Sequence, residues 1–161
     1  MKRNNIVNFP YNKKINQSHS KKLEWALKDF IKSIGYAYYE DEIENGIIAL
    51  YSKLNNGICV EQKIHIGIED YVCYTNLSCF VSPKNKSAIS HCKSVANAIN
   101  TELNYGNFEI LEDTGEIRYR TYYAPGDILY LESLDQLLGY PLHIINLYGT
   151  RFSTISNNSS L

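Results

Sequence analysis

Residues 58–68 read ICVEQKIHIGI, and apolar side chains recur along this stretch with a period of two. One parity is apolar, at Ile58, Val60, Ile64, Ile66 and Ile68, and the other holds Cys59, Glu61, Lys63, His65 and Gly67. This period is typical of a strand with one face on a core and the other in solvent. The alternating stretch 48–54 and the Asn-Asn-Gly run at 55–57 precede it and predict a hairpin.

Working outward, we expect a third strand over 71–81, although both of its parities carry apolar residues. Two more strands are expected from Phe108 and over 117–123, joined by a turn at Asp113-Thr114-Gly115. Apolar residues with helical spacing predict helices over 20–34, 84–103 and from about Ser133. Pro141 lies inside the last helix and should kink or split it, because proline removes a backbone hydrogen bond.

The element order predicts a single α+β domain, α-β-β-β-α-β-β-α. Short connections make the sheet antiparallel, and the single apolar stripe of each helix places the helices on one face. The polar stretch 1–17 is expected to form a flexible basic arm, 18–155 the domain and 156–161 a polar tail.

Composition excludes some classes of protein. The 161 residues are 44% hydrophobic with a net charge of −1, and no apolar run approaches the ~20 residues that a membrane span needs. A chain with this charge lacks the cation excess of most nucleic-acid binders, so we expect no nucleic acid partner. Residues 1–35 nevertheless hold eight lysines and arginines against two acidic residues. This basic region meets an anionic partner, lies on an acidic surface of its own chain or of a second copy, or is simply solvated. No signal-peptide pattern follows the first charges, so a cytoplasmic location is expected.

The sequence offers little catalytic chemistry. Phosphate-binding loops, zinc-protease motifs and nucleophile elbows are missing. Ser90-His91-Cys92-Lys93 matches S-x-x-K without the companion elements, and adjacent helical residues point about 100° apart. The four cysteines have no zinc spacing and are expected to be free buried thiols. We therefore expect no enzyme activity, catalytic residue, metal or cofactor.

The outward strand positions form a mixed aromatic and charged surface. Tyrosine and arginine often anchor protein interfaces, and they can also stack on single-stranded bases. The alternative is a solvated face that keeps the sheet soluble. The candidate partner-binding residues are Tyr51, Lys63, His65, Arg118, Arg120 and Tyr122.

The stretch NYGNFEILEDTGEIRYR at 104–120 resembles the signature of the bacterial YbjN family, a G-x-F-x-(I/L) strand, an acidic turn with glycine, and an E-(I/V)-R-Y-R strand. The resemblance covers residues 95–123 and departs from the family at Pro141. It implies a fold like that of type III secretion chaperones, small dimers that hold client segments without chemistry. Family members are labelled sensory transduction regulators. Within the motif, Phe108 and Tyr119 should face inward, and Arg118 and Arg120 outward.

These observations together predict a non-enzymatic, cytoplasmic protein-binding protein, chaperone-like or regulatory, expected to form a homodimer. Two alternatives remain open. One is a small ligand-binding protein or enzyme with a site between sheet and last helix, near Tyr123, Tyr140 and His143. The other is a toxin-neutralising immunity protein.

Overall fold

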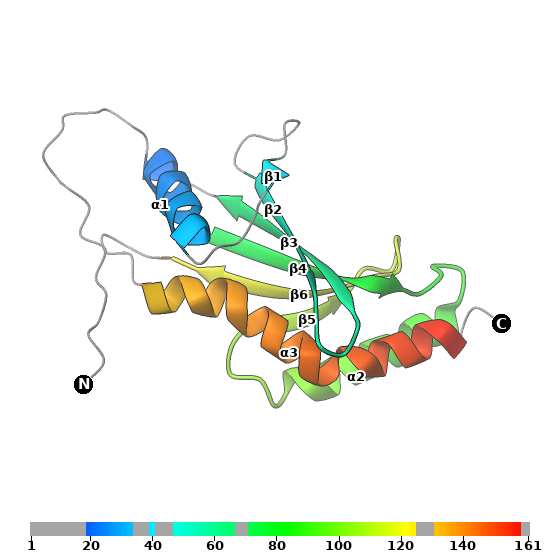
Figure 1. Cartoon of the computed structure of the whole chain (residues 1–161). Helices are drawn as coiled ribbons and strands as arrows, with labels where there is room; N and C mark the ends of the chain where they lie inside the picture. Colours follow the sequence, from blue (N-terminus) through cyan, green and yellow to red (C-terminus); the bar gives the residue numbers. More distant parts are fainter. Residues whose placement is uncertain (1–18, 34–38, 41–46, 67–70, 125–130, 159–161) are drawn as a thin grey trace, which may run out of the picture.

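A computed structural model describes residues 19–33, 39–40, 47–66, 71–124 and 131–158. The helices are α1 (His19–Ser33), α2 (Lys86–Asn100) and α3 (Leu131–Asn158). The strands are β1 (Tyr39–Glu40), β2 (Ile47–Lys53), β3 (Cys59–Ile66), β4 (Tyr71–Phe80), β5 (Asn107–Ile110) and β6 (Glu116–Tyr123) (Figure 1). The predicted α+β class, with strands in two groups on either side of α2, is confirmed.

The strands form one antiparallel sheet in the order β1-β2-β3-β4-β6-β5. All five predicted strands are present. The two-residue β1 was not predicted, because two residues are too short to show a period. The predicted arm at 1–17 lies outside the described residues.

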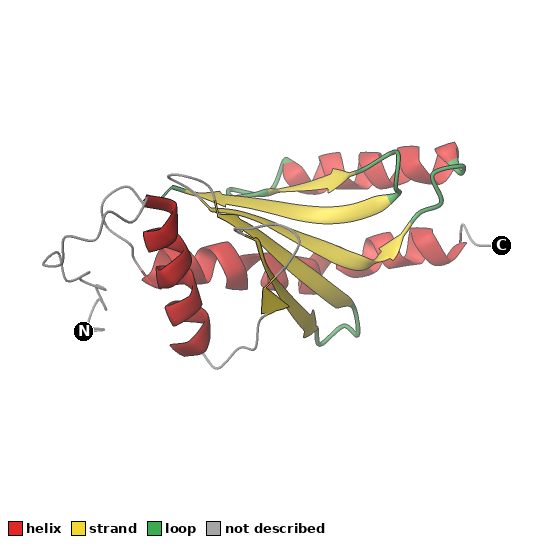
Figure 2. Ribbon diagram, turned by 90° about the horizontal axis from the view of Figure 1, so that it is seen from above, coloured by secondary structure: helices red, strands yellow, loops and turns green. Residues whose placement is uncertain are grey.

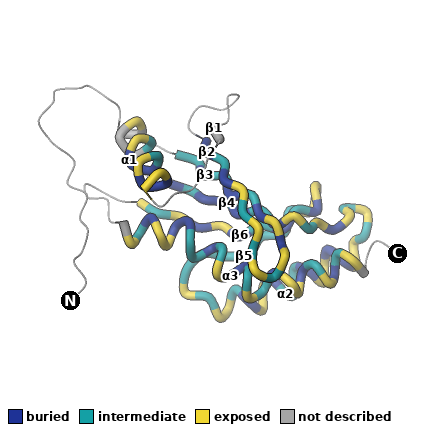
Figure 3. Tube along the Cα trace, viewed as in Figure 1, coloured by how far each residue is buried: buried dark blue, intermediate teal, exposed yellow. Residues whose placement is uncertain are grey.

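All three helices pack on the same face of the twisted sheet, as predicted (Figures 1 and 2). Buried and more accessible residues alternate along the strands (Figure 3). The core consists of two clusters. One joins α1 and the first turns of α3 to β2, β3 and β4, and the other joins α2 and the rest of α3 to β5, β6 and the far ends of β3 and β4.

The register settles the face assignment of β4, which its sequence left open. Tyr71, Cys73, Thr75 and Leu77 are buried beneath the helices, while the residues between them lie on the opposite face. Both parities of β4 carry apolar or aromatic side chains because side chains on the opposite face also pack against one another. On that face the packing centres on a tyrosine and its charged neighbours.

Helix α3 runs without a break through Pro141, so the proline does not split it. The helix changes direction near its middle (Figure 1), as a proline inside a helix is expected to cause. It begins at Leu131, before the expected Ser133, and extends to Asn158, past the expected boundary at 155. Within that extension, the Ser156 hydroxyl donates to the carbonyl of Phe80 at 2.5 Å.

The sheet provides hydrogen bonds at the point where the proline takes one away. Pro141 has no N–H for the carbonyl of Leu137, four residues earlier in α3. The Thr121 hydroxyl of β6 donates to that carbonyl at 3.1 Å. The next carbonyl, of Leu138, accepts from the Gln62 amide of β3 at 2.8 Å. Both polar side chains are buried, and each occupies an inward strand position that alternation alone assigns to an apolar residue.

A second contact fixes the β2–β3 hairpin on α3. The Asn56 amide donates to the carbonyls of Ile145 and Asn146, at 3.1 Å each. Its oxygen accepts from the backbone of Ile58 at 3.0 Å, which shapes the turn. The asparagine therefore serves the tight turn and also anchors it to the helix layer.

Replacing Thr121 tests its hydrogen bond to the Leu137 carbonyl, which Pro141 leaves without a helical donor. Thr121→Val should lower the free energy of unfolding by about 1–3 kcal/mol, because it leaves a buried carbonyl unpaired. In a Pro141→Ala background the alanine N–H can bond to Leu137, so the same change should cost at least ~1 kcal/mol less. Urea unfolding of the four proteins measures this coupling. An equal cost in both backgrounds would contradict the assignment.

Substitutions at two glycines with positive φ separate the cost of a strained backbone from the cost of a steric contact. Gly57 (φ 83) has open space around its Cβ position, whereas a Cβ on Gly115 (φ 73) would lie 1.7 Å from the carbonyl oxygen of Val81. Gly57→Ala should cost ~1–2 kcal/mol for the left-handed backbone alone. Gly115→Ala should cost a further ~1–3 kcal/mol, because the β5–β6 turn must move away from β4. Thermal unfolding compares them, and equal losses would refute the steric contribution.

Candidate interaction surface

We use the name outer face for the side of the sheet opposite the helices. No described helix covers it. The strand register arranges its side chains in rows that cross β3, β4 and β6. One row holds His65, Val72 and Tyr122, the next Lys63, Tyr74 and Arg120, and the third Glu61, Asn76 and Arg118.

Tyr74 lies at the centre of the outer face and brings three other side chains together. The Arg118 guanidinium carbon is 4.2 Å from the centre of its ring and that of Arg120 is 5.9 Å away. The His65 ring meets the tyrosine edge-on, with ring centres 5.2 Å apart. Cations within about 6 Å of an aromatic face are attracted by its quadrupole, so this cluster is held in place before any partner arrives.

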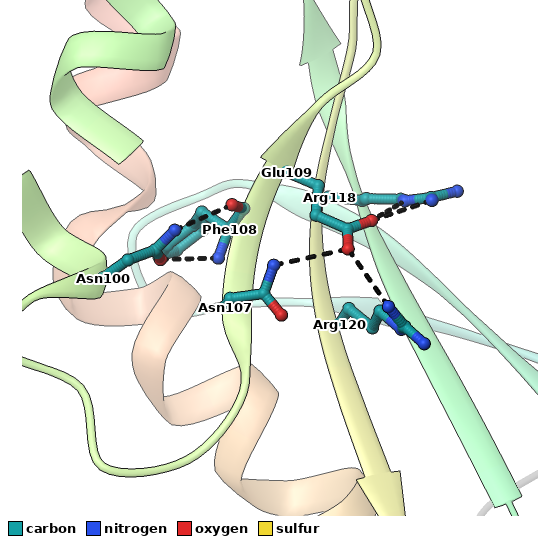
Figure 4. Close-up of polar contacts among 6 residues, drawn as sticks. All are labelled: Asn100, Asn107, Phe108, Glu109, Arg118 and Arg120. Carbon is teal, nitrogen blue, oxygen red and sulfur yellow. Dashed lines mark hydrogen bonds and ion pairs between the residues drawn. The ribbon is translucent and has the colours of Figure 1, made fainter. Parts of the chain in front are cut away.

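Glu109 of β5 anchors the two arginines (Figure 4). Its Oε2 accepts from Nε of Arg118 at 2.8 Å and lies 2.8 Å from NH2 of the same guanidinium. Its Oε1 lies 3.6 Å from NH1 of Arg120 and 3.3 Å from the amide nitrogen of Asn107. Arg118 is therefore tightly paired, whereas Arg120 is held loosely.

A smaller group lies toward β2. The Tyr51 hydroxyl donates to Glu61 at 2.6 Å, and the Lys63 ammonium lies 3.5 Å from the other oxygen of that carboxylate. Tyr51 and Tyr122, the two exposed tyrosines among those whose burial the structure describes, project from this side of the sheet, on strands separated by β3 and β4. The outer face thus presents aromatic surface with cations between.

All six candidate partner-binding residues lie on the outer face. The structure gathers His65, Arg118 and Arg120 around Tyr74, places Tyr51 and Lys63 on Glu61, and puts Tyr122 beside Val72. Sequence periodicity did not reveal Tyr74 and Glu109, which organise this surface. Tyr74 was missed because the parity of β4 was ambiguous. Glu109 could have been found, since it lies between the inward Phe108 and Ile110.

The β5 edge of the sheet is closed by α2. The Asn100 side chain accepts from the N–H of Phe108 at 2.7 Å and donates to its carbonyl at 3.0 Å (Figure 4). It therefore occupies the backbone groups that an added strand would use. A partner that bound beside β5 by strand addition would first have to displace this asparagine.

The alternative site between sheet and last helix is not assembled as expected. Tyr123 stacks on Tyr71 in the first core cluster, with ring centres 6.3 Å apart. Tyr140 packs edge-on against Tyr105, 5.9 Å away, in the second cluster. His143 is exposed on α3. These three side chains have three different surroundings.

The cysteines are free as expected, but the expectation that all four are buried is wrong for Cys59, which is exposed; Cys79 is partly buried, and Cys73 and Cys92 are buried. Burial raises the pKa of Cys73 to about 12 and that of Cys92 to about 11. Among the described residues, no three His, Cys, Asp or Glu side chains gather as metal ligands would. None of the described helices is long and apolar enough to cross a bilayer.

These thiols predict an order of alkylation. Iodoacetamide at pH 8 should modify Cys59 first in the folded protein and leave Cys73 and Cys92 unmodified. Burial shields the thiols of Cys73 and Cys92 from the reagent, and their raised pKa leaves little of the reactive thiolate. Peptide mass spectrometry reads the sites, and the protein in urea serves as the fully reactive control. Modification of Cys73 under native conditions would contradict the packing of β4.

The sequence matches no family model. No curated protein matches it either. The fold is similar to that in the crystal structure of YbjN from E. coli, described as "a putative transcription regulator", with a TM-score of 0.56 over 76% of this chain and 84% of that chain. The two sequences are 12% identical, so the similarity concerns the fold. The expected relationship to YbjN is therefore supported at the level of the fold and not of the family.

Proposed function

We propose that this chain is a non-enzymatic protein-binding protein, chaperone-like or regulatory, that holds a segment of its partner on the outer face. We further propose that it acts in the cytoplasm and forms a homodimer. The observation that carries the proposal is the one-sided architecture: the helices cover one face of the sheet, and the other presents an ordered cluster around Tyr74.

Order in this cluster favours binding over simple solvation. A solvated face needs only mobile charged side chains, whereas Arg118 here lies on the Tyr74 ring while Glu109 holds its guanidinium. Fixing such side chains before contact lowers the entropy cost of forming an interface. Arginine and tyrosine are also the residues most often found at interface hot spots.

The comparison of folds gives limited support of a second kind. The YbjN structure is described as that of "a putative transcription regulator", and a regulator acts through its partners. At this level of identity a shared fold does not carry a partner from one protein to another. The proposal therefore rests mainly on the outer face of this chain.

Photo-crosslinking tests the proposal at two positions of matched exposure. Tyr122 is 50% exposed on the outer face and Leu147 is 54% exposed on α3, in the helix layer. Each is replaced in turn by p-benzoylphenylalanine in the full chain, and cells expressing it are irradiated. We expect discrete protein adducts at position 122 and few at position 147.

The mass of each adduct separates the outcomes. An adduct of two copies of this chain at position 122 supports dimerisation through the outer face, and an adduct with another protein supports a client or regulated partner. Adducts at neither position, or with equal yield at both, overturn the proposal that the outer face is the binding surface.

A further inference from the structure

The cations of the outer face are not equally engaged. Arg118 is paired with Glu109 at 2.8 Å through two of its nitrogens, and its side chain is 24% exposed. Lys63 and Arg120 lie 3.5 and 3.6 Å from their carboxylates and are 41% and 44% exposed. Of the three cations nearest Tyr74, Lys63 and Arg120 are therefore the more exposed and the less tightly paired.

These two cations flank one tyrosine. Lys63 pairs with Tyr74 across β3 and β4, and Tyr74 pairs with Arg120 across β4 and β6. We name Lys63, Tyr74 and Arg120 the cationic row. With strands ~4.8 Å apart, its two charged residues are roughly 10 Å apart at the backbone. An aromatic ring lies between them.

The rows on either side of the cationic row limit which ligands can lie on it. On one side, Val72 and Tyr122 offer an apolar and aromatic strip. On the other, Glu61 and Glu109 bring negative charge. A ligand with negative charge at every step meets these carboxylates, whereas a chain with separated negative charges and apolar residues between them avoids both.

This pattern disfavours two other occupants. A nucleic acid strand places a phosphate at each nucleotide and is bound by many cations at once. The outer face of a second copy carries the same charges, with Lys53, Lys63, Arg118 and Arg120 against Glu61, Glu109 and Glu116, so direct face-to-face contact brings together two surfaces with the same excess of cations.

We infer that the outer face takes an acidic segment of a protein partner, with carboxylates at Lys63 and Arg120 and an aromatic or aliphatic side chain against Tyr122 and Val72. The inference rests on the proposed function and specifies its ligand. In a polyproline II chain, side chains three positions apart lie on one side and about 9 Å apart along the axis, so the two carboxylates belong three positions apart. The closed β5 edge is consistent with a segment that lies across the strands.

The probe is a fluorescent random copolymer of glutamate and tyrosine, which samples many spacings of acidic and aromatic residues. Binding to the full chain is followed by anisotropy. The test variant is Lys63→Gln with Arg120→Gln. The control is Arg151→Gln, because Arg151 lies 5.2 Å from the ring centre of Tyr148 on α3, a similar cation–aromatic contact in the helix layer.

We expect the copolymer to bind to the full chain, and we expect added salt to weaken this binding. The double variant should lose affinity by about tenfold or more, as removal of two interfacial charge pairs predicts, while the control stays within about twofold. Circular dichroism confirms that the variants fold. Binding that survives in the double variant overturns the inference, since the copolymer would then be held elsewhere, for instance by the basic region of residues 1–35.

Two further probes distinguish binding of an acidic peptide chain from binding of other charged polymers. A lysine and tyrosine copolymer should not bind at the outer face, and a 20-nucleotide oligothymidine should bind at least about tenfold more weakly than the acidic copolymer. Oligothymidine binding that is equally tight and equally sensitive to the double variant overturns the inference in favour of a nucleic acid. If no probe binds but position 122 still crosslinks to a protein, the acidic chemistry is wrong and the proposed function stands. If both experiments fail, both proposals fall.

Discussion

The structure depends on how a proline inside α3 is accommodated. Pro141 leaves the carbonyl of Leu137 without its helical donor, and a buried unpaired carbonyl is costly. Thr121 and Gln62 reach from the sheet to that carbonyl and the next one. These bonds fix α3 on the strands in one position. They lie where the two core clusters meet, because Leu138 belongs to one cluster and Tyr140 packs against the other.

The position of α3 has a consequence for the opposite side of the sheet. With α1, α2 and α3 all on one face, the apolar residues of the strands face them, and the alternate positions form the outer face. Its aromatic rings and guanidinium groups order one another around Tyr74. The architecture thus places the core and a preorganised surface on the two sides of the same strands.

The residues that suggest the YbjN resemblance have mainly structural roles. Gly106 adopts a positive φ, and a Cβ there would lie 2.5 Å from the Tyr119 hydroxyl oxygen. That hydroxyl donates to the carbonyl of Tyr105, and the Phe108 ring packs on Tyr119 and Phe152. Within this stretch Glu109, Arg118 and Arg120 contribute to the outer face, while the other contacts named here build the hairpin.

The sequence by itself determined the class, the helices and the orientation of most strands, because the periods of 2 and 3.6 depend only on local backbone geometry. It also placed all six candidate residues on one face. Tertiary structure alone decided that Tyr74 organises them, since the parity of β4 is settled only by what packs on each side. Local periodicity likewise assigns apolar residues to positions 62 and 121. Gln62 and Thr121 are polar there because they donate to the carbonyls of Leu138 and Leu137. Those carbonyls are 76 and 16 residues away in the chain, so local periodicity does not reveal them.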